Sequence, residues 1–150
     1  MAKKIIYTND SGNTVVITPA STDLTVEEIA AKDVPTGKSY TIVEDTDIPS
    51  DRSFRNAWAI SSGAIQVDMT KAKDIMRDKI REVRKDLLAA EDVVFMRAVE
   101  DADSDAQAAS ATRKQALRDA PAASGISNAS NVTALKSAWD TSLLGSNPYS

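Results

Sequence analysis

The longest uninterrupted helical pattern in the sequence runs from Thr70 to Asp101. No glycine or proline occurs in this segment, and its apolar residues recur at steps that mostly match the seam of a heptad repeat. The seam, which Lys73 interrupts, consists of Met69, Met76, Ile80, Val83, Leu87, Ala90 and Val94. We predict one helix of about 30 residues, which is ~45 Å long at ~1.5 Å per residue.

A helix of this length exceeds what a chain of 150 residues needs to cover its own core. Part of the seam is therefore expected to contact another chain, as a homo-oligomer or as part of a larger assembly. On this interpretation, Ile80→Asp combined with Leu87→Asp would separate the oligomer and leave the N-terminal sheet folded.

The first part of the chain, residues 1–68, reads as a small α+β docking unit. Thr25 and Glu28 have the spacing of a capping box, so a short helix is expected to begin at Val26 and to end near Pro35. Runs rich in β-branched residues, separated by turn residues, predict two antiparallel hairpins and a further strand. The predicted strands are 3–8, 14–18, 40–44, 57–60 and 64–68.

Residues 69–120 are predicted to form the long helix and a helical hairpin. The run DADSDA interrupts the helical pattern, with Ser104 or Asp105 as the expected cap of a second helix that ends before Pro121. Residues 121–150 are predicted to be a flexible loop, a short helix capped by Asn131 or Ser130, and a tail that frays unless a neighbour holds it. The predicted fold class is α+β: a small N-terminal antiparallel β unit with one short helix, then a long α-helix and helical hairpin.

The composition excludes most enzymatic chemistry, because the chain contains no cysteine and no histidine. Thiol nucleophiles, thiolate metal sites and the usual neutral-pH general base are therefore absent. The run Asp101-Ala-Asp103-Ser-Asp105 begins like a calcium loop, but Ala106 and Thr112 stand where glycine and glutamate are needed. No phosphate loop or catalytic serine motif occurs either. We expect no catalytic residue, cofactor, small-molecule substrate or metal ion.

The formal net charge is −4, so we expect no nucleic-acid partner and no attraction to an anionic membrane surface. No segment has the length of an apolar membrane span, and the start MAKKIIYTND lacks the apolar core of a secretory signal. Synthesis in the cytoplasm is therefore expected.

The ten residues PSDRSFRNAW, 49–58, concentrate charge and aromatic side chains. One interpretation is a structural corner: a helical turn capped by Ser50, with Asp51 paired to Arg55 and Phe54 packed on Trp58. The other is a surface that faces a partner. Trp139 and Tyr149 likewise could be partner anchors or core residues. The candidate interface residues are Arg52, Phe54, Arg55, Trp58, Met76, Ile80, Val83, Leu87, Val94, Trp139 and Tyr149.

Three segments, in the same order over most of residues 1–140, carry a family resemblance: DVPTGKSYTIVEDTDIPSDRSFRNAW, IQVDMTKAKDIMRDKIREVRKDLLAAEDVVFMRAVE and KQALRDAP. DRSFRNAW and KQALRDAP are the most specific parts. The chain resembles a set of small tailed-bacteriophage proteins that are encoded among tail and fibre genes. Those proteins carry leucine where this chain has Glu91. The resemblance implies a structural or assembly role in a phage and brings no catalytic residues.

Two functions follow as alternatives from the resemblance and the seam. The first is a virion component, an adaptor that binds tail, fibre or other virion proteins and is located in the virion. The second is a chaperone that holds a tail or fibre polypeptide until assembly and then leaves. The long seam favours the first, because it offers a permanent helix-to-helix interface. A small regulatory protein that binds a host factor is a third interpretation.

Overall fold

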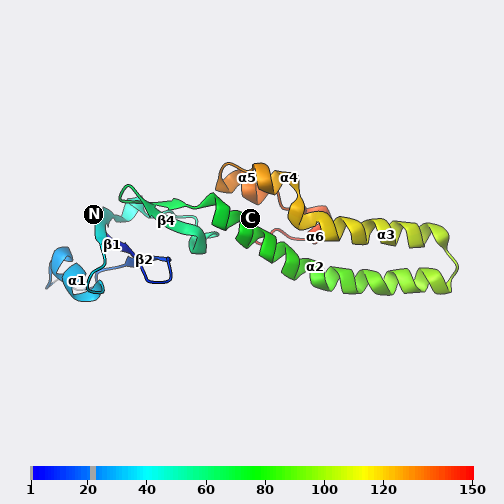
Figure 1. Cartoon of the computed structure of the whole chain (residues 1–150), viewed down its shortest axis with the longest axis horizontal. Coiled ribbons are helices and arrows are strands. Elements are labelled where there is room, and N and C mark those ends of the chain that lie inside the picture. Colours follow the sequence, from blue (N-terminus) through cyan, green and yellow to red (C-terminus); the bar gives the residue numbers. More distant parts are fainter. Residues whose placement is uncertain (1, 21–22) are drawn as a thin grey trace. The chain divides into compact units, whose positions relative to one another are not determined.

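The computed structural model describes residues 2–20 and 23–150. The chain divides into two compact units, Met1–Ala72 and Lys73–Ser150, where the sequence predicts three segments. The two predicted C-terminal segments belong to one unit, because the last helices pack onto the helical hairpin. The predicted α+β class is confirmed: a small antiparallel β unit precedes a long helix and further helices (Figure 1).

Three antiparallel strands form the sheet of the N-terminal unit. β1 (Lys3–Thr8) lies between β2 (Thr14–Ile17) and β3 (Tyr40–Glu44). Ile5 and Ile6 of β1 are both fully buried. Consecutive side chains of a strand point to opposite faces, so both faces of this small sheet are covered.

The short helix α1 (Val26–Asp33) covers the face that carries Ile5, and Ile29, Ala30 and Val34 complete that core. The predicted capping box is confirmed. Thr25 Oγ1 accepts a hydrogen bond from the Glu28 N–H at 3.2 Å, and Glu28 Oε2 accepts one from the Thr25 N–H at 2.7 Å. These two bonds satisfy amides that the first turn of a helix leaves unpaired.

A two-stranded hairpin covers the other face of the sheet. β4 (Trp58–Ser61) pairs with β5 (Ala64–Val67), and Trp58 and Ile65 pack against Ile6. Ser62 and Gly63 connect the strands, with φ angles of 52° and 78°. Two consecutive positive φ angles form the turn whose twist matches a tight hairpin, so the predicted second hairpin is confirmed.

The segment 49–58 differs from the predicted helical turn. A single 3₁₀ turn, η2 (Arg55–Ala57), replaces it, and another short turn, η1 (Asp45–Asp47), lies upstream of the segment. Asp51 does not begin a helix: its Oδ1 accepts a hydrogen bond from the Ser53 N–H at 3.0 Å. A short acidic side chain that binds a nearby backbone amide competes with helix formation, and this competition explains the error.

The long helix α2 (Met69–Glu100) has 32 residues, as the absence of glycine and proline predicts. It begins where Asp68 Oδ1 accepts hydrogen bonds from the Thr70 and Lys71 amides, at 3.0 and 3.2 Å. α3 (Ser104–Asp119) returns antiparallel beside α2, so the predicted hairpin is confirmed (Figure 1). Its cap is Asp103 rather than the predicted Ser104 or Asp105.

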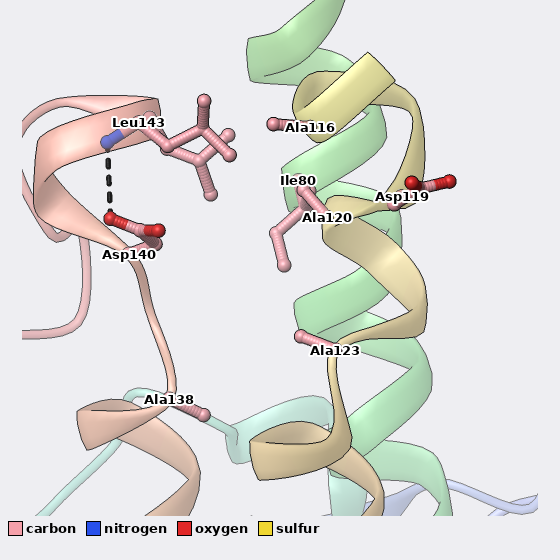
Figure 2. Close-up of a pocket in the computed structure, with 9 residues that line it drawn as sticks. Ile80, Ala116, Asp119, Ala120, Ala123, Ala138, Asp140 and Leu143 are labelled. Atoms are coloured by element: carbon pink, nitrogen blue, oxygen red, sulfur yellow. Dashed lines mark hydrogen bonds between the residues drawn. The ribbon is translucent and has the colours of Figure 1, made fainter. Parts of the chain in front are cut away.

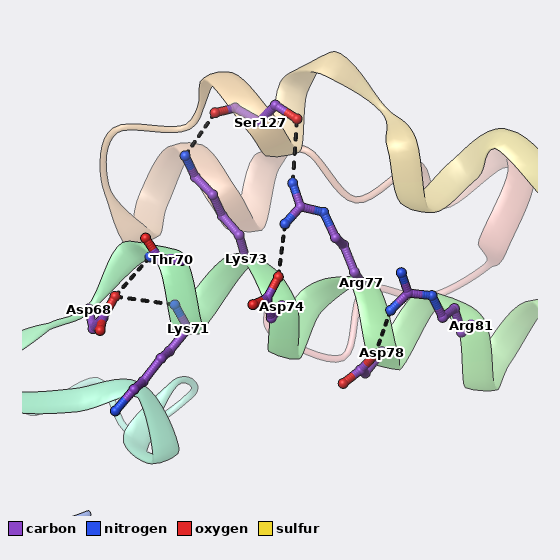
Figure 3. A network of polar contacts seen from close by, with 9 residues as sticks. All are labelled: Asp68, Thr70, Lys71, Lys73, Asp74, Arg77, Asp78, Arg81 and Ser127. Atoms are coloured by element: carbon purple, nitrogen blue, oxygen red, sulfur yellow. Dashed lines mark hydrogen bonds and ion pairs between the residues drawn. The ribbon is translucent and has the colours of Figure 1, made fainter. Parts of the chain in front are cut away.

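Four short helical elements follow the hairpin. They are η3 (Ala120–Ala122), α4 (Ser124–Asn128), α5 (Val132–Ser137) and α6 (Thr141–Leu144). The predicted flexible loop is wrong at α4, because Ile126 is fully buried. In Figure 3, Lys73 and Arg77 of α2 reach across to α4 and donate hydrogen bonds to the Ser127 carbonyl, at 2.8 Å, and to the Ser127 hydroxyl, at 3.4 Å.

The C-terminal tail is held by its own chain, contrary to the prediction that it frays unless a neighbour holds it. Trp139 Nε1 donates a hydrogen bond to the Gly145 carbonyl at 3.0 Å, and Asn147 Nδ2 donates one to the Lys136 carbonyl at 2.9 Å. The Tyr149 ring meets the Trp139 ring edge-on, with centroids 6.3 Å apart. A buried indole with a satisfied N–H is an effective anchor for such a segment.

Candidate protein-binding interface

Five of the predicted interface residues are buried inside the chain. They are Phe54, Trp58, Met76, Ile80 and Trp139. Their packing within the chain's own core accounts for them, so the first part of the α2 seam is covered without another chain. Val83, Leu87 and Tyr149 are half-buried.

The exposed members of the predicted set are Arg52, Arg55 and Val94. The Arg52 guanidinium lies 6.0 Å from the centre of the Trp58 ring, a distance at which a cation and an aromatic face attract. Arg55 lines a polar hollow of about 280 Å³ together with Asn56 and residues of the first hairpin. The contact with Trp58 therefore accounts for Arg52 within the chain itself, whereas Arg55 lies at a polar hollow of the N-terminal unit.

Polar contacts hold together the part of the hairpin nearest its turn. Gln107 and Ser110 of α3 donate side-chain hydrogen bonds to carbonyls of α2, at 3.2 and 3.3 Å. Arg113 Nε lies 3.3 Å from a carboxylate oxygen of Glu91, whose side chain is only 12% exposed. The Lys114 ammonium lies 2.5 Å from Asp92 and 5.2 Å from the centre of the Phe95 ring. Near the turn, α3 thus contacts α2 through small and polar side chains.

Four large apolar residues of α2 are exposed near this turn, each with 45–57% of its surface accessible: Val93, Val94, Met96 and Val99. Of these, only Val94 belongs to the predicted interface. A helix advances about 100° per residue, so Val93 and Met96 lie about 200° and about 140° around α2 from Glu91. Since Glu91 contacts α3, Val93 and Met96 lie on the opposite side of the helix. We call the exposed stripe of Ala89, Val93 and Met96 the tip face.

A shallow hollow of about 340 Å³ lies over the tip face. Its walls include Asp92 and Arg97 on either flank and Glu100 beyond Met96. Apolar side chains between an acid and a base form the kind of surface that binds another helix. The run VVFM, which places apolar residues on every side of the helix, was the sequence signal for this face.

A third hollow, of about 290 Å³, lies between α2, the end of α3 and α6 (Figure 2). Its lining is almost entirely apolar, with Ile80, Leu143 and several alanines, and with the carboxylates of Asp119 and Asp140. Hydrogen bonds from Ser142 and from the Leu143 amide lower the pKa of Asp140, which caps α6. Asp119 accepts hydrogen bonds from Gln115. Both carboxylates therefore have structural partners.

The described residues contain no group of three or more acidic side chains placed to hold a metal ion. Asp103, from the run that begins like a calcium loop, caps α3 instead. In the described parts of the chain, no helix combines the length and the apolar character needed to cross a bilayer.

Tyr149 supplies a pH-dependent test of the tail. Burial, and secondarily the negative charge of Glu82, raise the pKa of the Tyr149 phenol above its usual value of 10.0. Because the pKa of Tyr149 is higher in the folded chain than in the unfolded chain, the docked neutral phenol stabilises the fold fully below pH about 10. This stabilisation is lost as the pH rises through the pKa of the folded chain. Subtracting the absorbance titration of Tyr149→Phe from that of the wild type isolates the signal of Tyr149. We expect the midpoint of this difference to lie above pH 10 in the folded chain and to return to about pH 10 in denaturant. A midpoint at or below 10 in the folded chain would mean that the tail is not docked.

The comparisons with known proteins find no match to this chain among protein-family models, curated proteins or solved structures.

Proposed function

We propose that the chain is a protein–protein adaptor in the tail or fibre region of a tailed bacteriophage, without catalytic activity. The observation that carries the adaptor role is the tip face: large apolar side chains stand exposed on a rigid helix, where burial against another protein would be favourable. The phage context rests on the resemblance of residues 33–58, 65–100 and 114–121 to tail and fibre-associated proteins.

The two-unit architecture supports an adaptor. Each unit has its own internal contacts, and the N-terminal sheet is covered on both faces by its own helix and hairpin. One unit can therefore dock on a tail or fibre protein while the hairpin of the other binds a second chain.

A non-virion chaperone is the second candidate, and the modest size of the tip face favours it. A contact built on a few exposed side chains is typical of transient complexes, which bury less than about 1,200 Å² in total. A chaperone of this kind would bind a fibre or tail polypeptide and be absent from the finished particle.

Protein analysis of purified particles of the phage that encodes the chain separates the two candidates. We expect the chain in a fixed ratio to the major tail protein, retained after washing at high salt, because an apolar contact does not weaken with ionic strength. Absence from particles, with abundant chain in the lysate, would replace the adaptor with the chaperone.

A further inference from the structure

The tip face of α2 has a pattern of charge that is complementary to itself. Val93 and Met96 take neighbouring positions of a heptad, a and d, and Ala89 takes the preceding d position. In the same register, Asp92 is a g residue on one flank and Arg97 is the following e residue on the other. In parallel coiled coils, charges at these two positions pair between the helices.

We propose that the tip face binds the tip face of a second copy of this chain, with the two α2 helices parallel. Asp92 of each copy then meets Arg97 of the other, and the apolar stripes meet between these pairs. The sequence-based seam, which centres on Ile80 and Leu87, lies on another side of the helix. The inferred contact therefore uses a surface that α3 leaves open.

The side chains at both flanks are available for this contact. Arg97 has no side-chain hydrogen bond or ion pair within the described ranges, 2–20 and 23–150. Asp92 contacts Lys114 through Oδ1, and its side chain remains 61% exposed, so Oδ2 can accept a second donor. A carboxylate can accept several hydrogen bonds, and the intrachain pair does not prevent the intermolecular one.

The same charges disfavour an antiparallel pair. When two helices run in opposite directions, each flank faces the equivalent flank of its partner. An antiparallel contact centred on Val93 and Met96 would bring Asp92 towards Asp92 and Arg97 towards Arg97. Like charges so close are destabilising, so the pattern selects the parallel orientation.

The extent of the contact is limited at both ends. Asp86 and Glu100 occupy the a positions before and after Val93, where charged side chains resist burial between helices. The apolar part covers about 8 residues, or ~12 Å of helix at ~1.5 Å per residue. We therefore expect the parallel pair to form reversibly.

Single cysteines test the contact and its direction, because the natural chain has no cysteine. In a parallel pair, residue 93 lies beside residue 93 of its partner, within the roughly 4.4–6.8 Å between Cα atoms that a disulfide allows. We expect Val93→Cys and Met96→Cys, each alone in the full chain, to form cross-linked dimers under mild oxidation. Thr112→Cys on the exposed side of α3 is the matched control and should stay monomeric. Cross-linking of Val93→Cys no greater than that of the control would overturn the proposal. A disulfide found only when the Val93→Cys and Met96→Cys chains are mixed would also overturn it, because residue 93 lies beside residue 96 in an antiparallel pair.

A charge exchange tests the pairing itself. Sedimentation equilibrium at chain concentrations from about 1 µM to about 1 mM covers the affinities expected of a short contact. We expect Arg97→Asp to weaken self-association at least about tenfold, and Asp92→Arg/Arg97→Asp to restore it to near the wild-type value. Lys114→Ala, which removes the intrachain contacts of Lys114 with Asp92 and Phe95 and leaves the tip face intact, should leave self-association unchanged. A wild type that is monomeric at about 1 mM, or a double variant that self-associates no more strongly than Arg97→Asp, would refute the parallel pair.

The inference stands apart from the proposed function, because a chain that self-associates but is absent from particles loses only the adaptor role.

Discussion

Ile80→Asp is expected to unfold the C-terminal unit while the N-terminal unit stays folded. Ile80 is only 1% exposed, and Leu117, Ile126 and Leu135 of the same unit are also fully buried. An aspartate there would be a buried, unpaired charge in an apolar site, which costs more than about 4 kcal/mol. A loss of this size is comparable to the whole stability of a small unit. The sequence-based prediction was that Ile80→Asp combined with Leu87→Asp separates an oligomer; because Ile80 is buried, we now expect a loss of folding instead.

The two tryptophans make this result measurable. Trp58 belongs to the N-terminal unit and Trp139 to the C-terminal unit, and both are buried. With Trp139→Phe as background, Trp58 fluorescence should keep its folded emission in the Ile80→Asp variant, while the helical circular dichroism falls. Asp78→Asn, an exposed change one half-turn away, is the control and should leave both signals unchanged. Retained helicity in Ile80→Asp would show that the core is placed elsewhere.

Trp139→Ala is expected to have the second largest effect. Trp139 is buried, its indole N–H donates to the Gly145 carbonyl, and its ring contacts Tyr149. Replacing a buried tryptophan by alanine costs about 3–5 kcal/mol, and here the loss also releases the last residues of the chain. We expect a lower unfolding midpoint in denaturant together with rapid amide exchange from residue 145 onwards.

Trp139→Phe separates the two contributions of this side chain. It retains an aromatic ring for packing but loses the hydrogen bond to Gly145, so we expect a smaller loss, of about 1–3 kcal/mol. Tyr149→Ala should release the tail with little change in the midpoint of the whole unit. A tail that stays protected from exchange in Trp139→Ala would contradict its role as the anchor.

The N-terminal unit could be predicted closely from the sequence because its signals are local. Alternation of β-branched residues placed the strands, and Thr25 with Glu28 placed the start of α1. The error at residues 49–58 also has a local cause, since Asp51 binds the Ser53 amide in place of starting a helix. The sequence identified Phe54 and Trp58 as special, but only the structure shows that both lie in the interior.

The C-terminal unit was harder to predict because its packing joins distant residues. The length of α2 followed from the absence of glycine and proline, but the side of α2 that stays open depends on α3. Near the hairpin turn, α2 is contacted by Ser110, Arg113 and Lys114 of α3. Polar side chains of this kind give no sign in the sequence that they pack against another helix. The pairing of Arg113 with Glu91 turns an apparent break in the apolar pattern into an internal contact. Ile126 likewise looks like part of a polar loop until its buried position is seen.

The tip face escaped prediction for the same reason. A heptad template selects one apolar stripe, and residues 93–96 are apolar on several sides of the helix. The template assigned Val94 to an intermolecular seam, whereas the surface left open opposite α3 is that of Val93 and Met96. Where apolar residues surround a helix, only the packing of its neighbours decides which of them remain exposed.

For the proposed role as a virion adaptor, incorporation of a Val93→Asp/Met96→Asp chain into phage particles is the measurement that tests the tip face most directly. Both changes lie on exposed positions, so the variant should fold as the wild type does by circular dichroism. We expect its amount in purified particles to fall at least about tenfold, while Ala108→Asp/Thr112→Asp, which adds the same charge on exposed α3 positions, is incorporated normally. Wild-type levels of the folded Val93→Asp/Met96→Asp chain in particles would contradict a functional tip face.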